Sequence, residues 1–161
     1  MPDLPILIRR LRPAEIPLLA DFLYYAIYIP AGTAPPERSI LALPELQVYL
    51  EGFGTSAHDR ALVAVRDDQP VGCIWARIMH DFGHIDDRTP SLAMSVLPAH
   101  RGQGVGTSLL RAMLDLLRKD GYAQVSLSVQ KANDAVRLYR AAGFRTVREH
   151  PEELIMACRL N

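Results

Sequence analysis

Apolar positions along the chain follow two periods, and each period predicts a different kind of element. Apolar residues recur at helical spacing between Ile16 and Ile27 and again between Leu109 and Leu117. Short apolar runs rich in β-branched residues predict strands instead. These predicted strands cover residues 6–11, 61–66, 71–79, 91–97, 125–129, 144–148 and 154–160.

Proline, glycine and polar clusters separate these segments. Pro13 suits the first turn of the helix that runs to residue 27, and a stiff loop rich in proline follows it. Further helices are predicted over residues 43–53, from the glycines at 102–106 to about residue 119, and over residues 134–142. Turn residues at 67–70 join two strands as a hairpin, and residues 80–90 form an acidic, polar loop. This order of elements predicts one mixed α/β domain over residues 1–161 with a central sheet.

Composition excludes several classes of protein. Eighteen basic and 18 acidic residues give a net charge of zero without a basic run, which argues against a nucleic-acid-binding or membrane-surface protein. No apolar stretch reaches the roughly 18 residues of a membrane span. The first residues lack the basic and apolar segments of a signal peptide, so a cytoplasmic location is expected. Cys73 and Cys158 lie in separate apolar segments, which favours two reduced thiols over a disulfide framework or a structural zinc site.

The segment from Arg101 to Thr107 carries the most specific chemistry in the chain. Gly102, Gly104 and Gly106 alternate between a predicted strand and a predicted helix, so backbone N–H groups can approach a ligand without a Cβ in the way. The positive end of the helix dipole favours an anion there, and Arg101 adds a positive charge at the edge. A P-loop would need a Gly-Lys-Ser/Thr ending, and a dinucleotide fingerprint would need glycine at Thr107 or Leu109. The loop therefore predicts a phosphate site of another kind, and a glycine-rich strand-to-helix turn without a ligand is the alternative.

Two segments together resemble the GNAT superfamily of N-acetyltransferases. Arg101, Gly104 and Gly106 match its Arg-x-x-Gly-x-Gly pyrophosphate-binding signature, and residues 96–100 are similar to the strand end before it. Residues 133–144 resemble the second signature, in which an asparagine opens a helix, a Leu-Tyr pair lies within it and Gly-Phe ends it. The resemblance covers nearly the whole chain and is weakest over residues 24–56.

This resemblance implies a fold, a cofactor and a reaction. The fold would be a mixed, mostly antiparallel central sheet of about seven strands flanked by about four helices. Acetyl-CoA would be the acyl donor, and an amine of a small molecule or peptide would attack it directly in a ternary complex. Backbone groups of Ser95 and Val96 would hold the pantetheine arm and the thioester carbonyl where the fourth and fifth strands separate. The pyrophosphate would bind the backbone amides of Arg101, Gly102, Gln103, Gly104, Val105, Gly106 and Thr107.

Two further residues of the second signature acquire roles from the resemblance. Asn133 would hydrogen-bond the pantetheine, and Tyr139 would lie at the sulfur. A phenol has an ordinary pKa of about 10, so Tyr139 holds a proton at neutral pH that it can give to the departing thiolate. An amphipathic tyrosine of the core is the alternative interpretation of Tyr139.

The general base is harder to assign. Many members of the family carry a glutamate near the start of the strand before the glycine loop, but residues 89–94 contain no acid. A histidine side chain has an unperturbed pKa of about 6.5 in general, which makes His84 a candidate base, and Asp86 or Asp87 could act through a water chain. The alternative is a solvated acidic loop. His80, His84, Asp86 and Asp87 also have metal-ligating side chains, but one short loop gives them no scaffold, so no metal site is expected.

The acceptor pocket is expected near the end of the first helix, where the family varies with substrate. Tyr24, Tyr25 and Tyr28 lie there, and the four-residue spacing of Tyr24 and Tyr28 predicts a shared helical face. Aromatic side chains with polar tips suit a small amphipathic amine, although half-buried packing is the alternative.

Other interpretations of the whole chain stay open at this stage. A catalytically silent acyl-CoA sensor is favoured by the missing glutamate and disfavoured by the retained Tyr139 and Asn133. A nucleotide-binding protein is disfavoured by the absent P-loop lysine. The apolar segment from Leu154 to Cys158 could belong to a homodimer surface or to the core.

Overall fold

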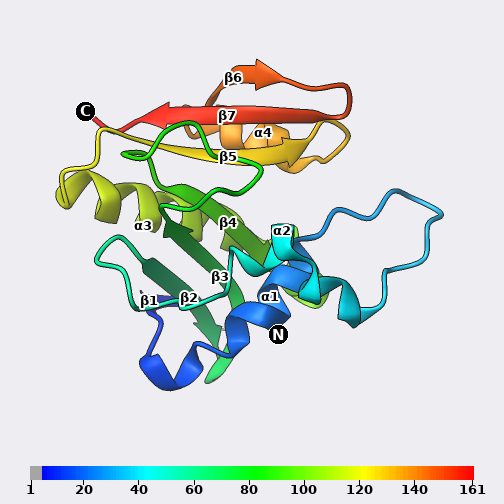
Figure 1. The fold of residues 1–161 in the computed structure, drawn as a ribbon. Helices are drawn as coiled ribbons and strands as arrows, with labels where there is room; N and C mark the ends of the chain where they lie inside the picture. Colours follow the sequence, from blue (N-terminus) through cyan, green and yellow to red (C-terminus); the bar gives the residue numbers. More distant parts are fainter. Residues whose placement is uncertain (1–4) are drawn as a thin grey trace.

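The computed structural model describes residues 5–161, which build one seven-stranded sheet (Figure 1). The strands are β1 (Leu7–Arg10), β2 (Arg60–Arg66), β3 (Gln69–Arg77), β4 (Ser91–Val96), β5 (Gln124–Gln130), β6 (Arg145–Glu149) and β7 (Glu153–Arg159). They lie in the order β1-β2-β3-β4-β5-β7-β6, and every neighbouring pair is antiparallel except β4 and β5. The predicted mostly antiparallel sheet is confirmed.

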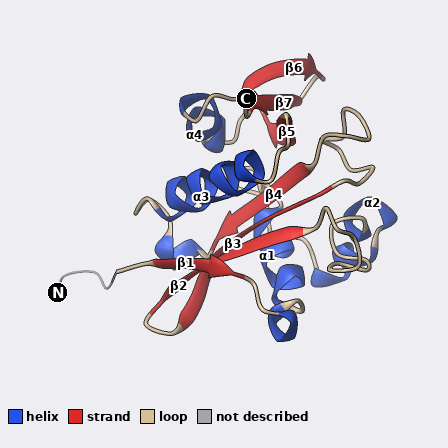
Figure 2. Ribbon diagram, turned by 90° about the vertical axis from the view of Figure 1, so that its left-hand side faces the viewer, coloured by secondary structure: helices blue, strands red, loops and turns tan. Residues whose placement is uncertain are grey.

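Helices cover both faces of the sheet, with α3 and α4 on one side and α1 and α2 on the other (Figure 2). The four helices are α1 (Leu18–Ala26), α2 (Pro44–Gln47), α3 (Val105–Lys119) and α4 (Ala135–Ala141). Short 3-10 turns occupy Pro13–Glu15, Arg38–Ala42 and Pro98–His100. No helix among residues 5–161 is both long enough and apolar enough to cross a membrane.

Side chains that alternate along the strands build two apolar clusters, one on each face. On β5, Val125, Leu127 and Val129 pack with α3, whereas Ser126 and Ser128 point to the opposite face. The segment from Leu154 to Cys158 is buried within the single chain, and Leu154, Met156 and Cys158 pack in the same apolar cluster as α3. These residues therefore belong to the core.

The predicted helix over residues 43–53 is wrong in its length, because α2 ends at Gln47. The backbone carbonyls after it accept hydrogen bonds from side chains of β3 rather than from a continuing helix. Trp75 Nε1 donates to Tyr49 O at 3.1 Å, and Arg77 Nη1 donates to Glu51 O at 2.9 Å. The segment after α2 is thus folded onto β3 in short turns.

A buried ion pair fixes this segment to the sheet. Arg77 Nε lies 3.1 Å from Asp59 Oδ1, and the two side chains are only 9% and 2% exposed. The second oxygen of Asp59 accepts the backbone N–H of Gly54 at 2.9 Å. Removing one partner of such a pair leaves the other charge buried without compensation.

We therefore expect Asp59→Asn to lower the free energy of unfolding by about 3 kcal/mol or more. The matched control is Asp115→Asn, because Asp115 pairs with Arg118 on the exposed surface of α3. That change should cost less than about 1 kcal/mol. Urea unfolding of the three proteins measures both values, and equal losses would contradict the structural role given to Asp59.

Candidate functional site

β4 and β5 separate after a single point of contact. Their only Cα partners are Ser91 and Ser126, next to which Ser126 N donates to Pro90 O at 3.0 Å. β4 stays paired with β3 as far as Val96, so its opposite edge is open toward β5 from Leu92 onward. An extended ligand can pair with such an edge through backbone hydrogen bonds.

The two faces of β4 differ in chemistry beside this opening, which we call the β4–β5 gap. Met94 and Val96 pack toward α3 and α4, and both lie near Gly106 in the first turn of α3. Ser91 and Ser95 point to the other face, where Ser95 Oγ donates to Phe22 O of α1 at 2.6 Å. The gap therefore has an apolar side and a hydroxyl-bearing side.

The glycine loop lies at the end of β4, after the 3-10 turn Pro98–His100. Gly102 and Gly104 have φ values of 73° and 84°, and a Cβ on either would meet open space. The first hydrogen bond of α3 runs from Ser108 N to Gly104 O at 3.1 Å. Within the described chain, the amides from Gly102 to Thr107 have no backbone acceptor. They are available as donors at the positive end of a 15-residue helix.

Basic side chains hold this loop in place. Arg101 Nε donates to Val96 O at 2.9 Å, and its Nη2 donates to Tyr25 O at 3.3 Å. The Arg101 charge therefore lies at the edge of the loop, tied to the ends of β4 and α1. Arg66 at the end of β2 donates to Gln103 Oε1 at 2.6 Å. Sequence reasoning did not select Arg66, since nothing in its own segment marks it.

Asn133 precedes the first residue of α4, and Tyr139 lies within that helix. Tyr139 is 7% exposed and packs edge-to-face on Phe144, with ring centroids 5.7 Å apart. Burial raises the pKa of Tyr139 to about 12, so the phenol keeps its proton and is a hydrogen-bond donor. Asn133 Oδ1 accepts the Ala135 N–H at 2.9 Å, while its Nδ2 has no partner among residues 5–161.

The three candidate acceptor-pocket tyrosines are placed differently from one another. α1 ends at Ala26, so Tyr28 lies beyond the helix and does not share a helical face with Tyr24. The Tyr24 hydroxyl donates to Pro36 O, and the Tyr28 hydroxyl donates to Ala132 O at 3.4 Å across the mouth of the gap. Tyr25 is the exposed member of the three, at 39%.

The predicted base candidates His84 and Asp86 lie in the loop between β3 and β4, where each has different hydrogen-bond partners. His84 donates from Nδ1 to Met79 O at 2.8 Å, and its Nε2 lies 3.3 Å from Asp87 Oδ1. Asp86 accepts the Arg88 N–H at 2.8 Å in an exposed turn. Hydrogen bonds from Thr89 and Arg88 lower the pKa of the Asp86 carboxyl.

His80, His84 and Asp87 bring their donor atoms within 4.8 Å of one another, and Asp86 lies outside this group. His80 and Asp87 are both 80% exposed, so the group forms a surface cluster.

Sequence reasoning missed Asp81 in the same loop. Ser91 Oγ donates to Asp81 Oδ1 at 2.7 Å, which places the carboxylate at the start of β4. Asp81 Oδ2 is buried and has no hydrogen-bond partner within the described residues. Burial raises the pKa of Asp81. The available signal was the alternation Val-Ser-Leu-Ser-Val on β5, which marks a hydroxyl-bearing face where an apolar one would be expected.

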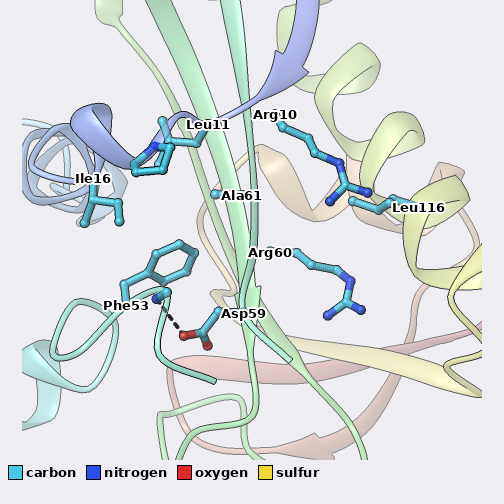
Figure 3. Close-up of a pocket in the computed structure, with 10 residues that line it drawn as sticks. Arg10, Leu11, Ile16, Phe53, Asp59, Arg60, Ala61 and Leu116 are labelled. Carbon is cyan, nitrogen blue, oxygen red and sulfur yellow. Dashed lines mark hydrogen bonds between the residues drawn. The ribbon is translucent and has the colours of Figure 1, made fainter. Parts of the chain in front are cut away.

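Two hollows in the surface of residues 5–161 lie near the elements described above. The first lies beside β1, β2 and the start of α1, and it is lined by Arg10, Phe53, Arg60 and Leu116 among others (Figure 3). It contains none of the predicted site residues. The second lies between α3 and α4, beginning at Thr107 and continuing along Arg111 and Leu138. This second hollow extends from the glycine loop.

Comparisons with known proteins identify similar sequences and folds. A family model described as the acetyltransferase (GNAT) family matches residues 25–144. The chain is 32% identical over 141 residues to the mycothiol acetyltransferase of Sanguibacter keddieii, covering 85% of this chain and 42% of that protein. Across the curated relatives it matches, the chain spans only 23% to 42% of their length.

Two solved structures share the fold along nearly the whole chain. An acetyltransferase of the GNAT family from Streptococcus pneumoniae has a TM-score of 0.72 at 20% identity, covering 98% of this chain and 100% of its own. The PaiA N-acetyltransferase of Thermoplasma acidophilum, solved in complex with coenzyme A, has a TM-score of 0.69 at 18% identity, with 96% and 99% covered.

The glycine loop generates a test with a matched control. Gly104 and Gly121 lie before and after α3, both have positive φ values, and both have open space around the missing Cβ. Alanine at either position should cost about 1–2 kcal/mol of stability. Only Gly104→Ala should weaken acetyl-CoA binding, by about tenfold in Kd. Calorimetric titration of the two variants measures this difference, and equal Kd values would show that the loop does not hold the ligand.

Proposed function

Because the chain belongs to the acetyltransferase (GNAT) family, we propose that it transfers the acetyl group of acetyl-CoA to an amine of a small molecule or peptide. One observation carries this proposal. The open edge of β4 leads directly into the glycine loop, so one extended ligand can occupy both. Acetyl-CoA is an extended ligand of this kind, because its pantetheine arm carries the thioester at one end and joins the pyrophosphate at the other.

The donor is bound by backbone groups in this proposal. Ser95 and Val96 hold the pantetheine arm and the thioester carbonyl, and the amides from Gly102 to Thr107 hold the pyrophosphate. Asn133 offers Nδ2 to the pantetheine from the opposite side of the gap. The hollow between α3 and α4 receives the adenosine end, where Arg111 supplies a positive charge for the ribose phosphate.

The acetyl group passes directly to the amine, without a covalent enzyme intermediate. Cys73 and Cys158 are both buried, and burial raises the pKa of each thiol. A thiol in that state supplies little thiolate and is a poor nucleophile. The amine nitrogen therefore attacks the thioester carbonyl carbon itself in a ternary complex, and the C–S bond breaks as the amide forms.

Tyr139 assists the departure of the thiolate. A phenol with a pKa of about 12 does not surrender its proton to a free thiolate of pKa about 8.5 in the ground state. It can donate a hydrogen bond to sulfur as negative charge develops there, and such bonds to charged atoms are strong in a dry site. Buried Tyr139 thus acts where charge appears in the transition state.

The acceptor approaches from the face covered by α1 and α2. Tyr25 is exposed there, and Tyr24 and Tyr28 fix the loops around it through their hydroxyls. His84 and Asp86 are the base candidates that the sequence itself suggests. An acyl-CoA sensor is the second candidate function, and the absence of an acid on β4 favours it.

We expect Tyr139→Phe to lower kcat by roughly 100-fold, the lower end of the range for losing one hydrogen-bond donor to a developing negative charge. The Kd for acetyl-CoA should stay within about twofold of the wild-type value, because the ring and its packing on Phe144 are retained. Steady-state kinetics combined with calorimetric titration separates the two quantities. Unchanged kcat would assign Tyr139 to the core alone.

The function itself is tested by CoA release from acetyl-CoA with a panel of amines: an amino sugar, spermidine, an arylalkylamine, an amino-terminal alanine peptide and a lysine peptide. Product should be identified by mass spectrometry. Turnover with one class names the acceptor. Tight acetyl-CoA binding without transfer to any amine would favour the sensor, and absence of binding would contradict both candidates.

A further inference from the structure

An acidic side chain lies beside β4, although β4 itself contains no acidic residue. β4 has the sequence Ser-Leu-Ala-Met-Ser-Val and so offers no carboxylate of its own. Asp81 reaches its first residue from the preceding loop, with Oδ1 accepting the Ser91 hydroxyl at 2.7 Å. Ser91 is also the last residue of β4 that pairs with β5. The Asp81 carboxylate therefore lies where the β4–β5 gap begins.

The loop can hold this position only because residue 83 is glycine. A Cβ at Gly83 would lie 2.8 Å from Leu127 C and 2.9 Å from Ser128 N, closer than any ordinary contact. Ser126 Oγ donates to Gly83 O at 2.7 Å, and His84 N donates to Asp81 O at 3.2 Å. The loop is thus packed directly on the hydroxyl-bearing face of β5, with Asp81 at its inner end.

Hydroxyl groups connect Asp81 to both sides of the gap. Tyr49, from the segment after α2, is buried beside Asp81 and Ser128, and both residues influence the pKa of its phenol. Ser128 lies on β5 just beyond the last pairing with β4. Ser128, Tyr49, Asp81 and Ser91 therefore form a polar chain from β5 to β4. Asp81 Oδ2 is its one acceptor without a hydrogen bond among the described residues.

The titratable and charged groups around Asp81 are few. Tyr49 faces it from the segment after α2, and Glu153 at the start of β7 acts on Tyr49. In its own loop, His84 directs Nδ1 to Met79 O and Nε2 to Asp87, while His80 is exposed. Burial raises the pKa of Asp81, and the Ser91 and Tyr49 hydroxyls partly lower it.

We propose that Asp81 is the proton acceptor of the reaction. The inference rests on the proposed acetyl transfer and assigns its missing base. The amine nitrogen forms a bond to the thioester carbonyl carbon, and the C–S bond breaks. Because Ser91 lies four residues before Ser95 on β4, the proton that the amine loses reaches Asp81 through water in the β4–β5 gap. The thiolate, held by a hydrogen bond from Tyr139, leaves as such or takes a proton from solvent, and protonated Asp81 releases its proton to solvent.

The test compares carboxylate-to-amide changes under identical conditions. Asp81→Asn keeps an acceptor for Ser91 but loses proton affinity, so kcat should fall by roughly 100-fold or more on the panel amine that the wild type acetylates best. Acetyl-CoA binding should be unchanged. Asp68→Asn is the matched control, since Asp68 lies in the exposed turn at the far end of β3 with a φ of 61° that asparagine tolerates. It should keep wild-type activity.

Ser91→Ala keeps the Asp81 carboxylate and should shift the pH profile of the reaction, whereas a purely structural role of Asp81 would not produce such a shift. The Ser91 hydrogen bond lowers the pKa of Asp81, so its loss should raise that pKa. A base works only when deprotonated, so kcat/KM falls as pH drops through its pKa. The acidic limb of the pH profile should therefore move to higher pH in Ser91→Ala, with most of the activity retained at high pH.

Several outcomes would overturn this assignment while leaving acetyl transfer intact. Undiminished kcat in Asp81→Asn is one, and an unmoved acidic limb in Ser91→Ala is another. His84→Gln and Asp86→Asn test the two rival bases, and a loss confined to either of them would transfer the role to that residue. If the wild type binds acetyl-CoA but acetylates no amine of the panel, the proposed function fails and the inference fails with it.

Discussion

The incomplete pairing of β4 with β5 is the feature on which the rest of the site depends. Each of the two strands is fully paired on its other side, β4 with β3 and β5 with β7, so the sheet remains one layer although its middle opens. Buried backbone N–H and C=O groups left without partners are costly. In the proposed complex, the pantetheine arm that runs along β4 satisfies these groups and completes the sheet.

Both ends of β4 carry the remaining chemistry. The glycine loop follows Val96 and offers amides to an anion, while Asp81 meets Ser91 at the other end. Side chains alternate between the faces, so Met94 and Val96 border the α3 side and Ser91 and Ser95 border the α1 side. Donor and acceptor can therefore enter from opposite faces and meet in the gap. One short strand thus sets the geometry of the proposed reaction.

Local signals in the sequence predicted the strands, α3, α4 and the glycine loop, because alternation, helical spacing and glycine spacing are written in consecutive residues. Features that depend on tertiary contacts were less accessible. α2 is short because Trp75 and Arg77, far along the chain, take the carbonyls after it. In the sequence, Asp81 is one of several acids in a polar loop. Its position at the gap depends on the packing of Gly83 against β5, which is a tertiary contact. Tyr28 lies beyond α1 because Ile27 adopts an extended backbone, and the apolar side chain of Ile27 gives no sequence signal for that conformation.

Hydrogen–deuterium exchange with and without coenzyme A tests the central claim most directly, since it reports which amides the ligand covers. We expect slowed exchange at Gly102 to Thr107 and along the open edge of β4, with Asn133 and its neighbours also affected. The hollow near Phe53 and Arg60 should exchange as before (Figure 3). Protection at that hollow, or at no segment of β4 and the glycine loop, would contradict a site built on the β4–β5 gap.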